Sequence, residues 1–226
     1  MKTLQVSIVR FPGTNCEYDT QYAFRKLGHE TDIVWHEEES IPENSDLVVI
    51  PGGFSYGDYL RSGSIARFSP VMKAVAEYAE KGGTVLGICN GFQVLTEAGL
   101  LPGALKRNNS LHFISRYQYI RVENNDNDFL KFCEVGDILN IPIAHADGNY
   151  FADEETLEDM RKNGQILLRY CNEDGEPMVV NGSVGQIAGI CNAKKNVFGL
   201  MPHPERAIED ILGSEDGLRM LEGFGN

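Results

Sequence analysis

One stretch near the middle of the chain places an apolar run, a cysteine and a helical pattern in direct succession. Residues 84–88 form the apolar run, and residues 92–98 have the spacing of a short helix. Gly87 and Gly91 stand on either side of Cys89. A strand, one reactive side chain and a helix, with glycines at the crowded positions, make the sharp turn called a nucleophile elbow. The stretch therefore predicts a buried strand that runs directly into a helix, with Cys89 at the turn.

The first hundred residues alternate between strand and helix patterns. Strand patterns cover residues 4–9, 31–35, 46–50 and 84–88, and helix patterns precede the glycines at 28, 82 and 99. The strand pattern at 46–50 is continuously apolar from Leu47 to Ile50, which is typical of a strand buried on both faces. This alternation predicts an α/β fold with an open, mostly parallel, flavodoxin-like sheet and helices on both faces.

Two of these helices carry sequence signals at their starts. Thr14 and Glu17 have the spacing of a capping box. Ser69 followed by Pro70 is typical of an N-cap and a first helical position. We therefore expect one helix to begin next to Thr14 and another at Pro70.

The second half of the chain has a different pattern. Residues 113–122, 138–144, 166–171 and 184–190 are strand-like, and only residues 153–162 between them read as a clear helix. We interpret this half as added, partly antiparallel strands on the same sheet. No internal repeat or low-complexity linker interrupts the chain, so we expect residues 1–226 to form a single domain.

The charge balance restricts the possible partners. Lys and Arg number 20 and Asp and Glu number 33, for a net charge of −13. Nonspecific nucleic-acid binding needs a basic surface, and anionic membranes attract basic segments. We therefore expect neither nucleic acid nor membrane among the partners.

The cysteines and the N-terminal sequence bear on compartment and metal binding. The five cysteines are scattered, without a Cys-x-x-Cys pair or a tight Cys/His cluster, so no structural zinc site is expected. No signal peptide and no membrane-spanning apolar run is visible. We expect a cytoplasmic protein with reduced thiols.

The second motif ends a strand pattern with Pro202, His203, Pro204 and Glu205. Residues two apart in an extended chain project to the same side, and the prolines hold this segment extended. Glu205 can therefore orient the His203 imidazole while its other ring nitrogen faces a thiol. With Cys89, the motif predicts a Cys–His–acid triad.

A glycine pair follows the strand pattern at 46–50. Gly52 and Gly53 leave their N–H groups open to a ligand, and the N–H of Asn90 follows the expected nucleophile. Such groups suit an oxyanion hole. An ordinary turn is the simpler reading of a glycine pair.

Three alternatives stay open at this point. Cys89 could be a buried cysteine that only fills space. Cys16 also lies near a helix start after a strand, but it lacks flanking glycines, and Glu17 beside it would raise the pKa of its thiol. His145 follows a strand and could act as the base or lie at the rim of the site.

The motifs together resemble those of class I (triad-type) glutamine amidotransferases. The resemblance rests on residues 51–53, 87–93 and 202–205, and it runs nearly end to end. Residues 10–16, 52–61 and 141–145 are similar to a purine-biosynthetic group of that family. One departure is Ala146 and Asp147, where the family is expected to have Gly and Glu.

The resemblance implies a role for each site residue. Cys89 would be the nucleophile, His203 the base and Glu205 the acid that orients it. The remaining site residues would form the oxyanion hole (Gly52, Gly53 and Asn90) and contact the bound glutamine (Gln93, Arg107 and Asn108).

The resemblance also implies partners. L-glutamine would be the substrate, and the ammonia would pass to a large synthetase subunit, with a small third subunit in the complex. ATP and Mg²⁺ are expected in the synthetase, since no G-x-x-x-x-G-K-[ST] sequence occurs here. No cofactor or metal is expected in this chain. A glutaminase of another pathway and a non-catalytic regulatory domain remain the alternatives.

Overall fold

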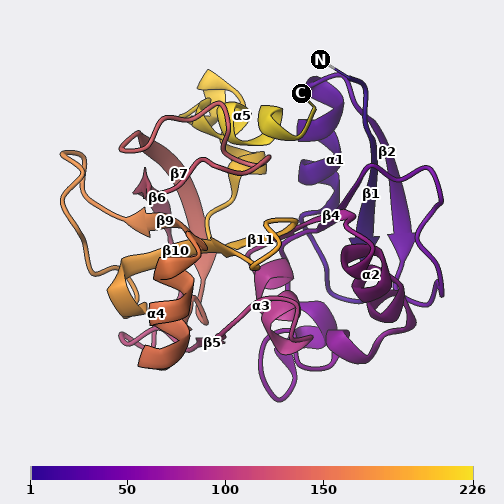
Figure 1. Cartoon of the computed structure of the whole chain (residues 1–226), viewed down its shortest axis with the longest axis horizontal. Coiled ribbons are helices and arrows are strands. Elements are labelled where there is room, and N and C mark those ends of the chain that lie inside the picture. The colour runs from indigo at the N-terminus through magenta and orange to yellow at the C-terminus, as the bar shows by residue number, and fades with distance from the viewer. Residues whose placement is uncertain (1, 226) are drawn as a thin grey trace.

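The computed structural model describes residues 2–225 and has one large sheet of nine strands (Figure 1). The strand order is β2-β1-β3-β4-β11-β10-β9-β6-β7. In chain order these strands are β1 (Gln5–Arg10), β2 (Glu30–Trp35), β3 (Leu47–Ile50), β4 (Thr84–Ile88), β6 (Ile114–Val122), β7 (Ile138–His145), β9 (Ile166–Tyr170), β10 (Ile187–Cys191) and β11 (Val197–Leu200). A separate antiparallel pair joins β5 (Ala104–Lys106) to β8 (Asn149–Phe151).

Five neighbouring strands of the large sheet are parallel. They are β2, β1, β3, β4 and β11, so the order along this half is the flavodoxin-like 2-1-3-4-5 with β11 as the fifth strand. The next four, β10, β9, β6 and β7, pair antiparallel. The predicted α/β fold with added antiparallel strands is confirmed.

The helices cover both faces of the sheet, as expected. They are α1 (Glu17–Lys26), α2 (Pro70–Glu80), α3 (Asn90–Glu97), α4 (Glu154–Lys162) and α5 (Asp216–Leu221). Right-handed crossovers place α1 on one face and α2 and α3 on the other. Both α1 and α5 pack against the short turn Pro204–Arg206, and Figure 1 shows α1 and α5 across the sheet from α3.

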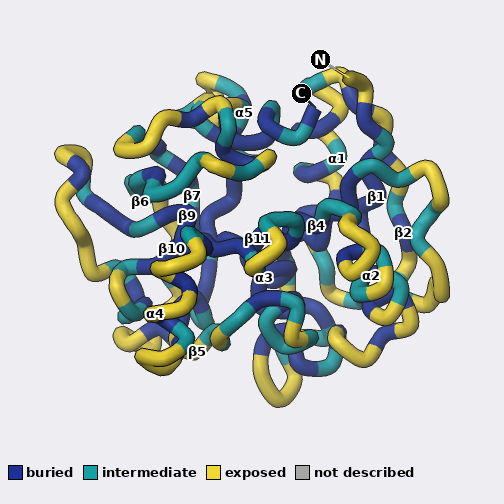
Figure 2. Tube along the Cα trace, viewed as in Figure 1, coloured by how far each residue is buried: buried dark blue, intermediate teal, exposed yellow. Residues whose placement is uncertain are grey.

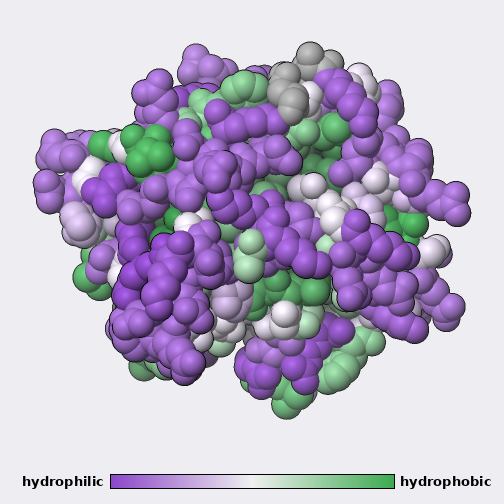
Figure 3. All heavy atoms as spheres, in the orientation of Figure 1, coloured by the Kyte–Doolittle hydropathy of each residue, from purple (hydrophilic) through white to green (hydrophobic). Residues whose placement is uncertain are grey.

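The apolar strands form the core. Every residue of β3, β10 and β11 is buried, and Figure 2 shows buried chain through the centre with exposed chain at the rim. The residues that face solvent are largely hydrophilic on the side seen in Figure 3, in keeping with the acidic composition. No helix among the described residues is long and apolar enough to cross a membrane.

Some local predictions need correction. The capping box is wrong, because Cys16 is the N-cap of α1 and the Thr14 hydroxyl instead accepts a hydrogen bond from the Phe11 N–H at 3.0 Å. Pro70 does begin α2, as predicted. The strand expected from residue 184 begins only at Ile187, because a turn with Gly185 at φ +56° precedes it.

Candidate active site

The carboxyl ends of four adjacent parallel strands, β1, β3, β4 and β11, meet at one edge of the sheet. Ligands bind at this edge in open α/β sheets. The segments that follow these strands carry Cys16, Gly53, Cys89 and His203, which line one cavity of about 130 Å³. Two motifs that lie far apart in the sequence therefore share one cavity, as the sequence predicts.

Cys89 occupies a strained turn between β4 and α3. Its backbone has φ +50° and ψ −104°, a conformation that non-glycine residues rarely adopt. A Cβ atom on Gly91 would lie 1.8 Å from the Ile50 carbonyl oxygen, and one on Gly87 would lie 2.5 Å from Leu95 Cδ1. The glycines are thus required because α3 packs directly on the sheet, and the predicted strand–turn–helix is present.

His203 and Glu205 form a buried pair beyond β11. His203 Nδ1 lies 2.7 Å from Glu205 Oε1, and both side chains are almost wholly buried. Burial acts to lower the pKa of His203, but the Glu205 carboxylate and the charge on Cys89 outweigh it, so the pKa lies well above its usual range. Because Nδ1–H is bonded to Glu205, Nε2 is the ring nitrogen left to face the cavity, and it has no hydrogen-bond partner there. The thiols of Cys16 and Cys89 both interact with the ring.

Backbone N–H groups near Cys89 remain open. Within residues 2–225, neither Gly52 nor Gly53 donates its N–H to another backbone group. The Gly52 carbonyl is held by the N–H groups of Asn15 (3.4 Å) and Cys16 (3.2 Å). A Cβ atom on Gly52 would lie 2.7 Å from His203 Cε1, so only glycine fits beside the imidazole. This arrangement supports the predicted oxyanion hole, as does the free N–H of Asn90 in the first turn of α3.

Cys16 is closer to the triad than its sequence context suggests. It is buried in the same cavity, its sulfur accepts a hydrogen bond from Arg206 Nη2 at 3.1 Å, and its S–H donates to Asn15 Oδ1 at 3.1 Å. Burial raises the pKa of the Cys16 thiol, and interaction with His203 opposes the rise. One sequence signal could have placed Cys16 at the cavity. It follows β1, and the carboxyl ends of all the parallel strands lie at this edge of the sheet.

His145 also lies near the site but in a different state from His203. Burial, and then the charge of His203, lowers the pKa of His145 to about 4. Its Nδ1 lies 3.2 Å from Asn108 Oδ1. A histidine that is neutral at pH 7 and bonded to an amide suits a supporting position, so the structure favours His203 as the base.

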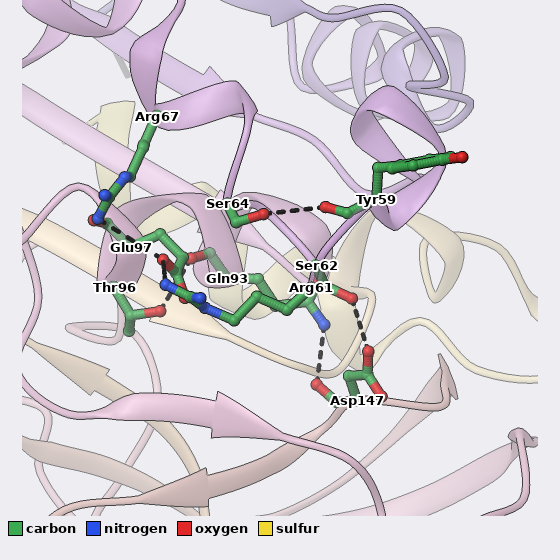
Figure 4. A network of polar contacts seen from close by, with 9 residues as sticks. All are labelled: Tyr59, Arg61, Ser62, Ser64, Arg67, Gln93, Thr96, Glu97 and Asp147. Atoms are coloured by element: carbon green, nitrogen blue, oxygen red, sulfur yellow. Dashed lines mark hydrogen bonds and ion pairs between the residues drawn. The ribbon is translucent and has the colours of Figure 1, made fainter.

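Asn90 and Gln93 link the start of α3 to two loops, the one after β3 and the one after β7. Asn90 Oδ1 accepts a hydrogen bond from the Ser55 N–H at 3.0 Å, and Asn90 Nδ2 donates to Gln93 Oε1 at 2.9 Å. Gln93 Nε2 then donates to the Asp147 carbonyl oxygen at 2.8 Å (Figure 4). Both ends of the Gln93 amide are thus held by the protein, and its contact with substrate stays a prediction.

The segment after Gly53 is anchored at Arg61 and Ser62 and exposed just before these two residues. Arg61 makes a two-pronged ion pair with Glu97 at the end of α3, at 2.6 and 2.7 Å (Figure 4). Ser62 Oγ donates to Asp147 Oδ2 at 2.8 Å. Just before these anchors, Tyr59 is 74% exposed and Leu60 is 87% exposed.

The other two residues expected to contact glutamine differ in burial. Asn108 is fully buried, and its side-chain amide bonds the His145 carbonyl oxygen (2.9 Å) and the Gly148 N–H (3.0 Å). Asn108 thus shapes the loop after β7. Arg107 is exposed next to it. Direct contact of either residue with glutamine stays a prediction.

Several known proteins are similar to this chain over nearly its whole length. A family model described as a CobB/CobQ-like glutamine amidotransferase domain matches residues 3–216. The phosphoribosylformylglycinamidine synthase subunit PurQ of Sulfurimonas denitrificans is 63% identical over 98% of this chain and 99% of that protein. The subunit of the same name from Wolinella succinogenes is 60% identical over the same shares. A solved structure of PurLQS from Thermotoga maritima aligns with a TM-score of 0.89 and 41% identity, over 99% of this chain and 98% of that one.

Proposed function

Because the chain belongs to the CobB/CobQ-like glutamine amidotransferase family, we propose that it is the glutaminase subunit of phosphoribosylformylglycinamidine synthase. In this role it hydrolyses L-glutamine to glutamate and ammonia. The ammonia is delivered to an ATP-dependent synthetase subunit that converts formylglycinamide ribonucleotide to formylglycinamidine ribonucleotide in purine biosynthesis. The relatives that support this assignment carry that enzyme's name and align over nearly their whole length.

The first half-reaction forms a thioester. The Cys89 thiolate attacks the side-chain amide carbon of glutamine, and the N–H groups of Gly52, Gly53 and Asn90 receive the developing oxyanion. His203, protonated and held by Glu205, gives a proton to the leaving nitrogen, so the C–N bond breaks and ammonia departs. The high pKa of His203 and its position beside both sulfur and carboxylate support this role.

The second half-reaction restores the enzyme. A water molecule loses a proton to the now neutral His203 and attacks the thioester carbonyl. The C–S bond breaks, glutamate leaves, and Cys89 returns to its starting state. Arg107, Asn108 and Gln93 belong to the surrounding loops and would position the substrate directly or through these loops.

The ammonia requires a second protein. Ammonia that reaches bulk water is protonated and no longer nucleophilic, so the glutaminase must work beside its synthetase. The solved structure that resembles this chain is of PurLQS, a complex by its name. We assign the large synthetase subunit as the partner, with a small third subunit, and place ATP and Mg²⁺ in the synthetase.

One observation carries the proposal, the buried His203–Glu205 pair facing the strained Cys89 across a cavity with open N–H groups. The test is reconstitution with the synthetase subunit from the same cell. We expect formation of formylglycinamidine ribonucleotide with glutamine as nitrogen donor. A Cys89→Ser complex should still use added ammonium salts. If the wild-type complex uses ammonia but never glutamine, the assigned function is wrong.

A further inference from the structure

Three buried side chains at the edge of the cavity come together in a way that a catalytic triad does not need. A sulfur of Cys16, a ring nitrogen of His203 and a carboxylate oxygen of Glu205 lie within 4.8 Å of one another. The triad uses His203 and Glu205, but the mechanism gives Cys16 no role. Thiolate, imidazole and carboxylate are the ligands that zinc prefers in proteins.

Two of these residues also present unsatisfied atoms. His203 Nε2 and Glu205 Oε2 are buried, and neither has a hydrogen-bond partner in the described structure. Both residues are 2% exposed. Buried polar atoms normally have a partner. An ion in this cluster would give Glu205 Oε2 a partner. It would bind the imidazole at Nδ1, in place of the proton there, because Nδ1 is the ring nitrogen that faces the carboxylate.

The charges around the cluster can accommodate a divalent ion. A thiolate and a carboxylate together balance two positive charges. The one nearby cation that contacts the sulfur, Arg206, is paired with Asp19 at 3.0 Å. A metal that coordinates a thiol removes its proton.

We propose that Cys16, His203 and Glu205 form a binding site for one thiophilic divalent cation of the zinc class. These three residues hold the ion, and the cavity gives the fourth position to water, as in other three-ligand zinc sites. The bound ion takes His203 and Glu205 from the triad and so stops thioester formation reversibly. The binding itself stands on the cluster alone, and only the inhibition rests on the proposed function.

The direct test is titration of the reduced full-length chain with Cd²⁺, followed by the ultraviolet charge-transfer band of a cadmium–thiolate bond. We expect one ion per chain and a band that is lost in Cys16→Ser but kept in Cys89→Ser. A chelator competition with Zn²⁺ should show about 100-fold or greater weakening in Cys16→Ser, since even changes to outer-shell partners cost 10–100-fold.

Cys191→Ser is the matched control, because Cys191 is equally buried but lies within β10, outside the cavity. It should bind cadmium like the unchanged chain. Alkylation of the unchanged chain with and without Zn²⁺, mapped by mass spectrometry, tests the site without any substitution. Zn²⁺ should protect Cys16 from alkylation. Absence of a stoichiometric band, an unchanged band in Cys16→Ser, or protection confined to other cysteines would overturn the site. Zinc inhibition of glutamine use is then measured separately, so a failed glutaminase assay leaves the binding result intact.

Discussion

Cys89 and its neighbours show how single residues set up the chemistry. A non-glycine residue in so rare a conformation costs about 1–3 kcal/mol, and the fold tolerates this cost at the one position where the thiol must face the cavity. His203 is the complementary case, because a histidine buried without a partner would stay neutral. The carboxylate of Glu205 at 2.7 Å reverses that effect.

The first prediction separates the two members of this pair. Glu205→Gln should lower the kcat of glutamine hydrolysis by roughly 100-fold, and His203→Ala by closer to 10⁴-fold, because the acid orients the base but transfers no proton. The loss of the carboxylate should also shift the His203 titration to lower pH, which NMR of the imidazole ring can follow. If His145→Ala were as damaging as His203→Ala, the choice of base would be wrong.

A second residue-level prediction concerns Asp58. Burial raises the pKa of its carboxyl to about 6, and the charge of Asp147 adds to the rise while Ser62 opposes it. The folded state therefore holds the proton more tightly than the unfolded chain, so stability falls as the pH rises from about 4 to 6. Asp58→Asn should raise the melting temperature at pH 8, and the gain should shrink toward pH 4. A gain of equal size at both pH values would argue against a perturbed Asp58.

At the scale of elements, the contact of α3 with β3 determines the shape of the elbow. The Gly91 backbone lies against the Ile50 carbonyl so closely that a methyl group would require α3 to move. Gly91→Ala should therefore destabilise the fold by about 3 kcal/mol, as overpacked sites do. Gly57→Ala is the control, because no atom lies within 4 Å of the position where its Cβ would be. Gly57→Ala should lower the free energy of unfolding by only about 1 kcal/mol, because of the left-handed backbone at this position. Urea unfolding measures this quantity for both variants.

The elements differ in how far the sequence predicts them. The strands β1 to β4 and the helices between them are visible as apolar runs and helical spacing, because a fully buried strand leaves little room for polar residues. The pair β5–β8 is too short to give a period. The capping pattern misplaces the start of α1, because the Thr14 hydroxyl accepts a hydrogen bond from the Phe11 N–H and does not cap the helix, whose N-cap is Cys16.

The site residues also divide into those that the sequence predicts and those that it does not. Cys89, His203 and Glu205 can be predicted because each lies in a local motif with a chemical reason. Cys16 and Asn108 reach the site only through strand order and loop packing, which local sequence does not encode. The Gln93 side chain is a further case, since its hydrogen bonds to Asn90 and Asp147 depend on the loop after β7.

At the scale of the whole molecule, the cavity opens on a face with several exposed apolar side chains. Phe54 and Phe113 line the cavity and are 44% and 50% exposed, and Leu60, in the segment that follows Phe54, is 87% exposed with a positive φ of +69°. This face is where the synthetase must dock if ammonia is to pass directly between the two sites.

We therefore predict that Leu60→Asp weakens the complex with the synthetase by at least tenfold, since buried interface anchors contribute about 2 kcal/mol or more. Ile211→Asp is the control, because Ile211 is equally exposed at 89% but lies on the short turn Asp210–Leu212 between β11 and α5 and does not line the cavity. Calorimetry or analytical ultracentrifugation can compare the two. Equal weakening by both variants would contradict docking over this face.

We predict that glutamine is broken down through a thioester on Cys89. The most direct measurement is mass spectrometry of the complex after rapid acid quenching with glutamine, with digestion to locate the added mass. We predict a γ-glutamyl group on the peptide that carries Cys89. The fraction of this peptide that is acylated should be highest at early quench times, and the group should be absent in Cys89→Ser. A γ-glutamyl group on the peptide with Cys16, or steady glutamine hydrolysis with no acyl group on any cysteine, would rule out Cys89 as the nucleophile.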